Sequence, residues 1–528
     1  MKNFMENGWF YSRRQILHYL KTRPSSLKPP KTKLDNPIHV LGQLNRHQWL
    51  MFSCGFIAWV WDAFDYFSVS LTLTDIANDF GVDYSDVSWG MTITLMLRSV
   101  DALIFGTIAD RYGRKWPMII NLCFFIVLEL ASGFCQNLSQ FLAVRSLYGI
   151  AMGGMFGPAA STALEELPYD ARGILSGLFQ NGYSTGYLLV AIFYRALVPT
   201  TRHGWRSLFW FASGPPIFII AFRLWLPETN HFQVLQGERK ARVELLNLST
   251  NEDIVSSSPR KRKEMIVFLK DAAKSVGENW VLLIYMVILM TGFNSCSHGS
   301  QDFYPTYLKA QVGLGPTDVT VISVVGQIGS ICGGTVIGFV STFSGRRLAM
   351  LTACVFGGSL VPAYIIPRNM GLVASAFFEQ FFVGGVWGPI PIHLMELAPP
   401  YLRTTVIGLT YQLGNLASSA SATIQAVIGE RFPLPLSSTG EKTFDYGKVI
   451  AIFMGAVWVY VFIFLFLGPE MSQEEREQET EAVRDLEAKR REGADLAQIG
   501  ADLAGGGNKD MFSIQVHLEN VTVAVGEI

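Results

Sequence analysis

Twelve stretches of this chain are apolar and long enough to cross a lipid bilayer, each needing about 20 residues. Their approximate ranges are 48–72, 87–109, 116–134, 139–161, 173–197, 205–226, 280–308, 318–341, 347–366, 370–393, 404–429 and 447–468. Only 16% of the 528 residues are charged, against about one quarter in soluble domains. The sequence therefore predicts an all-α membrane protein with twelve transmembrane helices, and it argues against a disordered chain or an ordinary soluble enzyme.

Charge placement predicts the orientation in the membrane. Nine Lys and Arg residues lie between Lys2 and Arg46, whereas the first predicted outer loop is acidic, with four aspartates between positions 75 and 86. By the positive-inside rule, the amino terminus is expected in the cytoplasm, and twelve crossings return the carboxyl terminus to the same side. The formal net charge of -1 gives no reason to expect nucleic acid as a partner.

The two halves of the chain repeat each other. A shift of 231 positions places the Gly153-Gly154-x-x-Gly157-Pro158 string on Gly384-Gly385-x-x-Gly388-Pro389 without a gap. Paired halves of this kind are typical of transporters whose substrate binds between the repeats near the bilayer midplane. The predicted organisation is a cytoplasmic segment 1–47, a six-helix bundle 48–229, a cytoplasmic linker 230–278, a second six-helix bundle 279–468 and a cytoplasmic tail 469–528.

A glycine-rich and charged motif joins the second and third predicted helices. Its defining residues are Gly106, Asp110, Arg111, Gly113, Arg114 and Lys115. The glycines permit close packing, and Asp110 can pair with a cation or a helix amino terminus, which would make a lock that forms and breaks. These residues resemble the G-x-x-x-D-R-x-G-R-K signature of the major facilitator superfamily, which implies a gating role and the two-bundle fold of that superfamily.

The related position after the eighth helix carries Thr342 in place of the aspartate, so the lock is expected to be asymmetric. Arg145-x-x-x-Gly149-x-x-x-Gly153 resembles a second signature of the superfamily and adds Arg145 to the expected gating residues. The glycines alone also fit a simple helix-packing face.

Charged residues inside membrane spans are functional candidates because burying them is costly. Arg98 lies near the middle of the second helix, where it could bind a carboxylate or pair with a nearby aspartate. Asp62 and Glu379 could carry a proton or serve structural pairing. Glu129 is expected at the membrane interface.

The seventh predicted helix holds the densest polar cluster of the spans. Asn294, His298, Gln301 and Asp302 lie within an arc of about 100°, with His298 and Asp302 one turn apart. Pro305 cannot donate to the Gln301 carbonyl, so a kink is expected beside the cluster. On the eleventh helix, Gln412 and Asn415 share a face, where they could line the same cavity or bond neighbouring helices.

The polar string on the seventh helix carries a closer resemblance. Its matched residues are Asn294, Ser297, His298, Ser300, Gln301, Asp302 and Thr306. They resemble the N-x-x-[ST]-H-x-[ST]-Q-D-x-x-x-T signature of the fungal JEN family of lactate and carboxylate permeases. The resemblance implies a plasma-membrane symporter that moves a short carboxylate together with a proton, with these residues involved in binding and transport.

The leading hypothesis is therefore proton-coupled uptake of monocarboxylates such as lactate and pyruvate by alternating access. Arg98 would anchor the carboxylate, Asn294 and Gln301 would form hydrogen bonds with it, and His298 with Asp302 would respond to protons. The alternatives are a dicarboxylate:proton symporter for succinate or malate, and a nutrient receptor that signals through its tails without transport. Cytoplasmic regulators of the tails and membrane lipid are further possible partners. No nucleotide-binding loop, catalytic set, cofactor motif or metal-ligand spacing occurs in the sequence.

Overall fold

The computed structural model of the protein describes residues 13–27, 36–82, 84–249, 257–429, 431–434, 444–471 and 473–504. Parts of the predicted amino-terminal segment (1–12 and 28–35) and the end of the predicted tail lie outside these ranges. Within them the backbone is helical, apart from connecting turns and one isolated bridge between Pro433 and Phe444. The predicted all-α fold is confirmed.

The first bundle contains six helical passes, several of which are interrupted. They are α4 (Arg46–Phe80), α5 (Tyr84–Tyr112), α6 (Lys115–Gly133), α7 with α8 (Leu138–Gly153 and Phe156–Leu164), α9 with α10 (Tyr169–Gln180 and Gly182–Leu197) and α11 with α12 (Arg206–Ala212 and Pro216–Trp225). A reciprocal hydrogen-bonded cap between Asn45 and Gln48 starts α4, and Gly81 ends it with a left-handed φ of 66°. Because α4 extends to Phe80, it includes part of the predicted first outer loop.

The second bundle repeats this plan. Its passes are α14 with α15 (Ser257–Gln301 and Tyr304–Tyr307), α16 (Pro316–Ser344), α17 (Arg346–Ile365), α18 with α19 (Leu372–Trp387 and Ile390–Leu397), α20 with α21 (Arg403–Ser418 and Ser421–Gly429) and α22 (Tyr446–Leu467). The expected kink in the seventh pass is present, because α14 stops at Gln301 and α15 starts just before Pro305.

Judged by length and composition alone, seven of the described helices are long and apolar enough to cross a membrane, or eight if a bent pair is counted as one span. Other passes divide at breaks, such as Gly154 and Met155 between α7 and α8, so no single helix carries the full length. Such breaks are tolerated at membrane depth where neighbouring helices bury the backbone.

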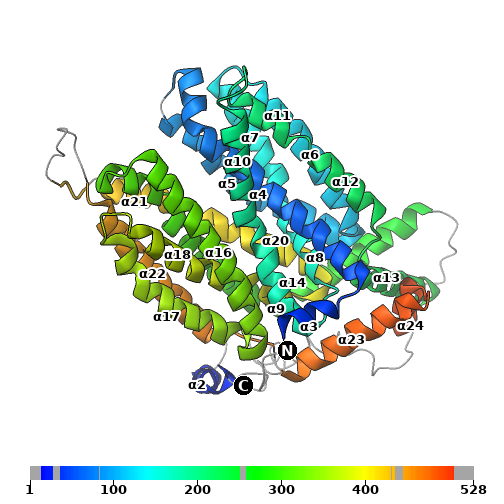
Figure 1. Cartoon of the computed structure of the whole chain (residues 1–528). Helices are drawn as coiled ribbons and strands as arrows, with labels where there is room; N and C mark the ends of the chain where they lie inside the picture. Colours follow the sequence, from blue (N-terminus) through cyan, green and yellow to red (C-terminus); the bar gives the residue numbers. More distant parts are fainter. Residues whose placement is uncertain are drawn as a thin grey trace.

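Shorter helices cover one end of the molecule. They include α3 (Pro37–Gly42), α13 (Asn230–Ser249), α23 (Gln473–Arg491) and α24 (Leu496–Ala504), as Figure 1 shows. Helix α13 and the first turns of α14 occupy the range predicted as the linker. We call the end that carries α13, α23 and α24 the closed end, because the two bundles pack tightly there.

Glycines allow that tight packing. A Cβ atom on Gly106 of α5 would lie 2.7 Å from the Thr405 Cα atom of α20, and one on Gly177 of α9 would lie 2.2 Å from the Gly334 carbonyl oxygen of α16. Among the described residues, hydrogen bonds between the bundles reach as far from the closed end as Ser184 and Ser330. Beyond that level the bundles diverge in Figure 1.

Candidate functional site

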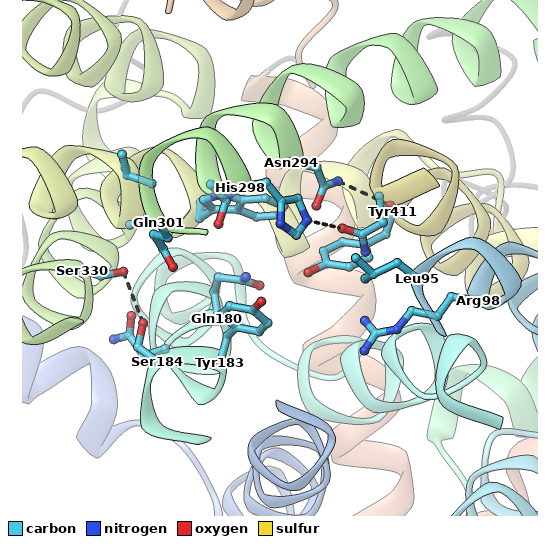
Figure 2. A pocket seen from close by; sticks show the side chains of 16 residues that line it. Leu95, Arg98, Gln180, Tyr183, Ser184, Asn294, His298, Gln301, Ser330 and Tyr411 are labelled. Atoms are coloured by element: carbon cyan, nitrogen blue, oxygen red, sulfur yellow. Dashed lines mark hydrogen bonds between the residues drawn. The ribbon is translucent and has the colours of Figure 1, made fainter. Parts of the chain in front are cut away.

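A small cavity lies between the two bundles near the middle of the molecule. Its walls come from α5, α9, α10, α14, α16, α18 and α20, and its volume is about 30 Å³. That is close to the volume of one water molecule in the liquid, so an organic ion would require the walls to move apart. Figure 2 shows Arg98 reaching the cavity from the first bundle and His298 from the second.

Arg98 is held at the cavity by close helix packing. A Cβ atom on Gly153 would lie 1.9 Å from the Arg98 carbonyl oxygen, so only glycine lets α7 approach α5 this closely. The buried guanidinium donates to the thioether sulfur of Met152 and lies 5.1 Å from the Tyr66 ring centroid. A thioether is a weak acceptor, and the Arg98 Nε atom has no hydrogen-bond partner among the described residues. Arg98 therefore retains donor capacity for an anion.

The seventh pass contributes a connected chain of polar side chains. His298 Nδ1 lies 2.8 Å from an Asp302 carboxylate oxygen, and His298 Nε2 lies 3.3 Å from the Asn415 amide oxygen of α20. Asn415 in turn donates to the Gln412 side-chain oxygen at 2.9 Å. Both nitrogens of the imidazole therefore face acceptor oxygens, an arrangement that suits its doubly protonated form.

The other predicted binding residues take different positions around this chain. Asn294 and Gln301 line the cavity. Gln301 donates to Gln380 of α18 at 2.9 Å, and Asn294 donates to the Met290 carbonyl oxygen one turn earlier. Gln412 and Asp302 do not line this cavity. Gln412 contacts it through Asn415 and Asp302 through His298, and the Asp302 side chain is 38% exposed.

Two further residues expected to handle protons are buried outside the cavity wall. Asp62 of α4 lies within electrostatic range of Arg98, and one of its oxygens has no hydrogen-bond partner among the described residues. Glu379 of α18 accepts a hydrogen bond from the Trp458 indole of α22 at 3.2 Å. Glu379 therefore faces the interior of the second bundle.

Arg145 lies away from the cavity. Its guanidinium forms a buried ion pair with Glu129 at 3.0 Å, within the first bundle. Glu129 is buried inside the bundle, where this pairing offsets the charge that would otherwise exclude a carboxylate from the protein interior. Gly149 and Gly153 on the same helix pack against α5, as a helix-packing face would.

Aromatic rings seal the cavity toward the closed end. Tyr411 of α20 stacks on Phe156 of α8 with centroids 4.1 Å apart, and Trp59 of α4 and Trp387 of α18 contact Tyr411 at 5.9 and 5.6 Å. The seal thus consists of rings from both bundles. A solute in the cavity could reach the closed end only after these rings separate.

Asp110 joins the two bundles at the closed end. Its carboxylate accepts hydrogen bonds from the Thr404 backbone N–H at 3.1 Å and from the Thr405 N–H and hydroxyl at 2.7 and 2.8 Å. Asp110 therefore caps the amino terminus of α20, where an anion is favoured by the helix dipole. Arg114 lies 3.7 Å from Asp110 and 2.8 Å from Glu165.

The remaining motif residues support this contact. Gly113 adopts a φ of 104°, which favours glycine, and the Arg111 guanidinium lies 5.1 Å from the Tyr112 ring centroid. In the second bundle, Thr342 stands opposite Gly173 and accepts a hydrogen bond from Arg346. Because Thr342 stands where the first bundle has Asp110, the contact that Asp110 makes has no carboxylate counterpart at this position; an asymmetric lock stays a prediction.

Several residues at the site carry little sequence signal. Ser184, Ser330 and Trp387 line the cavity, and Gln380 orients Gln301. Gln380 could have been recognised as a polar residue in an apolar span. The serines and the tryptophan are too common in membrane helices to stand out.

Comparisons with known proteins agree with this architecture. Residues 46–481 match the family described as Sugar (and other) transporter. The Carboxylic acid transporter protein homolog of Saccharomyces cerevisiae is 40% identical over 428 residues, which cover 80% of this chain and 68% of that protein. The Cis,cis-muconate transport protein of Acinetobacter baylyi is 23% identical over 418 residues, covering 78% of this chain and 96% of that protein.

A solved structure shares the fold. The proton:xylose symporter XylE, bound to 6-bromo-6-deoxy-D-glucose, superposes with a TM-score of 0.64 at 15% identity, covering 81% of this chain and 97% of XylE. The two bundles with a cavity between them are thus the fold of a membrane transporter. The chain belongs to the major facilitator superfamily, in the Sugar (and other) transporter family. Its resemblance to the JEN permeases is confirmed by the 40% identical yeast relative.

Proposed function

We propose that this protein takes up short-chain monocarboxylates, such as lactate and pyruvate, together with protons across the plasma membrane. The observation that carries the proposal is the cavity, in which the incompletely bonded guanidinium of Arg98 faces polar side chains of α14. The 40% identical yeast relative, named as a carboxylic acid transporter homolog, supports a carboxylate as the substrate class.

Arg98 supplies the charge and the geometry for one carboxylate. A guanidinium can donate two parallel hydrogen bonds to a carboxylate, a match that an ammonium group lacks. Among the described residues, Arg98 is the only arginine or lysine in the cavity wall. One guanidinium fits one carboxylate. Of the other described lining residues, protonated His298 alone could pair with the second carboxylate of a dicarboxylate, and this proposal assigns that charge to the transported proton.

His298 and Asp302 would take up the transported proton as a pair. The acceptor oxygens on both sides of the imidazole stabilise its protonated form, and the partly exposed Asp302 gives the pair access to water. Because the two groups lie 2.8 Å apart and are hydrogen-bonded, they would act together as one proton-accepting unit. Asn415, held in place by its hydrogen bond to Gln412, would accept a hydrogen bond from His298 Nε2 when that nitrogen carries a proton.

The proton is needed to bring an anion into a negatively charged cell. A membrane potential of 100 mV opposes entry of one negative charge by about 2.3 kcal/mol. One co-transported proton cancels that charge for a monocarboxylate, so the pH gradient can drive uptake. With both termini in the cytoplasm, the closed end faces inward and substrate enters from the outside.

Alternating access would then require the lock at the closed end to break. The hydrogen bonds of Asp110 to α20 hold the bundles together there. Their rupture, together with separation of the rings around Tyr411, would open the cavity to the cytoplasm. Arg145, paired within one bundle, would move with that bundle and act only indirectly.

The proposal is tested by uptake of radiolabelled lactate into cells that lack other carboxylate transporters, with succinate as competitor. Saturable lactate uptake that excess pyruvate abolishes and succinate leaves intact supports it. Stronger inhibition by succinate would instead indicate a dicarboxylate permease. Protein that reaches the surface but moves neither acid would indicate another substrate or a receptor. Deletion of residues 472–528 should leave uptake intact in a transporter, whereas a receptor should lose its signalling output.

A further inference from the structure

A second hollow lies on the outside of the first bundle, at the closed end. It forms where the start of α4, the end of α12 and the end of α23 meet, and its volume is about 470 Å³. Its apolar wall includes Leu50, Trp225 and Leu226, while Arg46, Arg490 and Arg491 supply its charge. Volumes of this size are typical of sites for small molecules. The hollow is separate from the transport cavity, with which it shares no lining residue.

The apolar wall continues the lipid-facing surface of the protein. Helices α6 and α12 pack side by side, and both expose apolar side chains, including Ile217, Phe218, Phe124 and Val127. At the closed end of these helices, Trp225 is 63% exposed and Trp116 is 57% exposed. Exposed tryptophans at the end of an apolar band mark the boundary between lipid tails and headgroups. The hollow therefore opens at headgroup depth.

The polar side of the hollow is cationic. Among the described residues that line it, three are arginines and none is acidic. His47 also lines it, but its imidazole is turned to Glu166, 2.8 Å away. Just beside the hollow, Lys115 donates to the carbonyl oxygens of Leu224 and Leu226, which places a further cation at the end of α12.

We propose that this hollow binds the headgroup of an anionic glycerophospholipid. The arginines would bind the phosphate and any further negative charge of the headgroup, since guanidinium groups match phosphate oxygens. The acyl chains would follow the exposed apolar face of α12 and α6 away from Trp225. A lipid fits better than a free phosphate because the hollow combines arginines with an apolar wall, and Trp225 of that wall lies at the end of the exposed apolar face of α12.

Occupancy would also tie α23, in the tail that follows the second bundle, to the first bundle. Arg490 and Arg491 end α23, whereas Arg46 begins α4. One bound headgroup would therefore connect residues more than 440 positions apart in the chain. The bound lipid is thus expected to stabilise the folded protein as a ligand does.

The test uses the purified full-length protein in an uncharged detergent. Short-chain phosphatidylinositol, short-chain phosphatidylcholine and inorganic phosphate are titrated separately, and the thermal midpoint is followed by tryptophan fluorescence. Phosphatidylinositol should raise the midpoint in a saturable manner, while the other two should not. An equal rise with inorganic phosphate would replace the lipid with a free-anion site, and an equal rise with phosphatidylcholine would show that charge is not recognised.

Variants locate the effect. The double variant Arg490→Gln/Arg491→Gln should need about 30-fold more phosphatidylinositol for half of the shift, since each arginine near an anionic headgroup contributes about fivefold. Arg46→Gln, on a different helix, should need about fivefold more phosphatidylinositol for half of the shift. This variant keeps the test valid if the double variant displaces α23. Arg484→Gln, an exposed position on α23 outside the hollow, is the matched control. An unchanged response in both Arg46→Gln and the double variant would overturn the proposal.

Discussion

Replacing Arg98 and Arg145 separately should distinguish a binding arginine from a structural one. Both are buried arginines on helices of the first bundle. Arg98 reaches the cavity and has a thioether as its hydrogen-bond acceptor, whereas Arg145 is paired with Glu129 at 3.0 Å. The same substitution to glutamine should therefore change different quantities at the two positions.

For Arg98→Gln, the loss is worked from two charged hydrogen bonds to the substrate. Each contributes at least about 1.5 kcal/mol, so the substrate complex should weaken by about 3 kcal/mol, which is roughly a hundredfold in KM. The thermal midpoint should change little, because the guanidinium contributes little bonding to the free protein. The KM of Arg98→Lys should lie between those of the unmodified protein and Arg98→Gln, since lysine keeps the charge and loses the paired donors.

For Arg145→Gln, the buried Glu129 carboxylate loses its partner. Breaking a buried ion pair from one side costs about 3–5 kcal/mol, so the thermal midpoint should fall while the KM of the surviving protein stays close to normal. Labelled lactate uptake at graded concentrations, with surface protein quantified, gives KM, and fluorescence gives the midpoint. A normal KM in Arg98→Gln, or a hundredfold increase confined to Arg145→Gln, would refute the assignment.

Three further predictions concern the closed end. Asp110→Ala removes three hydrogen bonds to α20 and should open this end, seen as a longer distance between spin labels at the half-buried position 107 and the exposed position 270; an unchanged distance would contradict the lock. Burial, with nearby Arg403 and Arg114, lowers the pKa of His231 on α13 well below its usual value. The unfolded chain then binds the proton more readily, so the stability of the folded protein should fall as pH drops below about 6.5. If the thermal midpoint differs between pH 7.5 and 5.5 by the same amount in His231→Gln, this prediction is contradicted. Gly500→Leu should expose the tail to limited proteolysis, since a Cβ atom there would lie 2.0 Å from the Val234 carbonyl oxygen, whereas the exposed control Gln498→Leu should keep its protection.

The sequence predicts the local chemistry of the site well and its long-range pairing poorly. His298 and Asp302 meet because they lie one turn apart on a single helix, which periodicity reveals. The bonds of His298 to Asn415 and of Gln301 to Gln380 depend on how separate helices pack, and no single segment encodes them. The choice between two arginines likewise becomes visible only when Glu129 is found beside one of them.

The sequence predicts helix boundaries less well, for a different reason. Apolar content marks the part of a helix that contacts lipid, but α14 continues for about six turns before that part, starting at Ser257. Charged residues are compatible with a helix in water, so hydropathy does not reveal the first turns of α14. Conversely, breaks such as the one after Gly153 interrupt passes that the apolar pattern presents as continuous.

Proton movement measured together with lactate uptake tests the central claim most directly. The purified protein is reconstituted into liposomes without an imposed gradient, lactate is added outside, and the external pH is recorded alongside labelled lactate entry. The proposal predicts external alkalinisation proportional to lactate entry and, in His298→Ala and Asp302→Asn, loss of coupled uptake with normal reconstitution. Lactate entry without a change in external pH, or normal coupling in both variants, would contradict it.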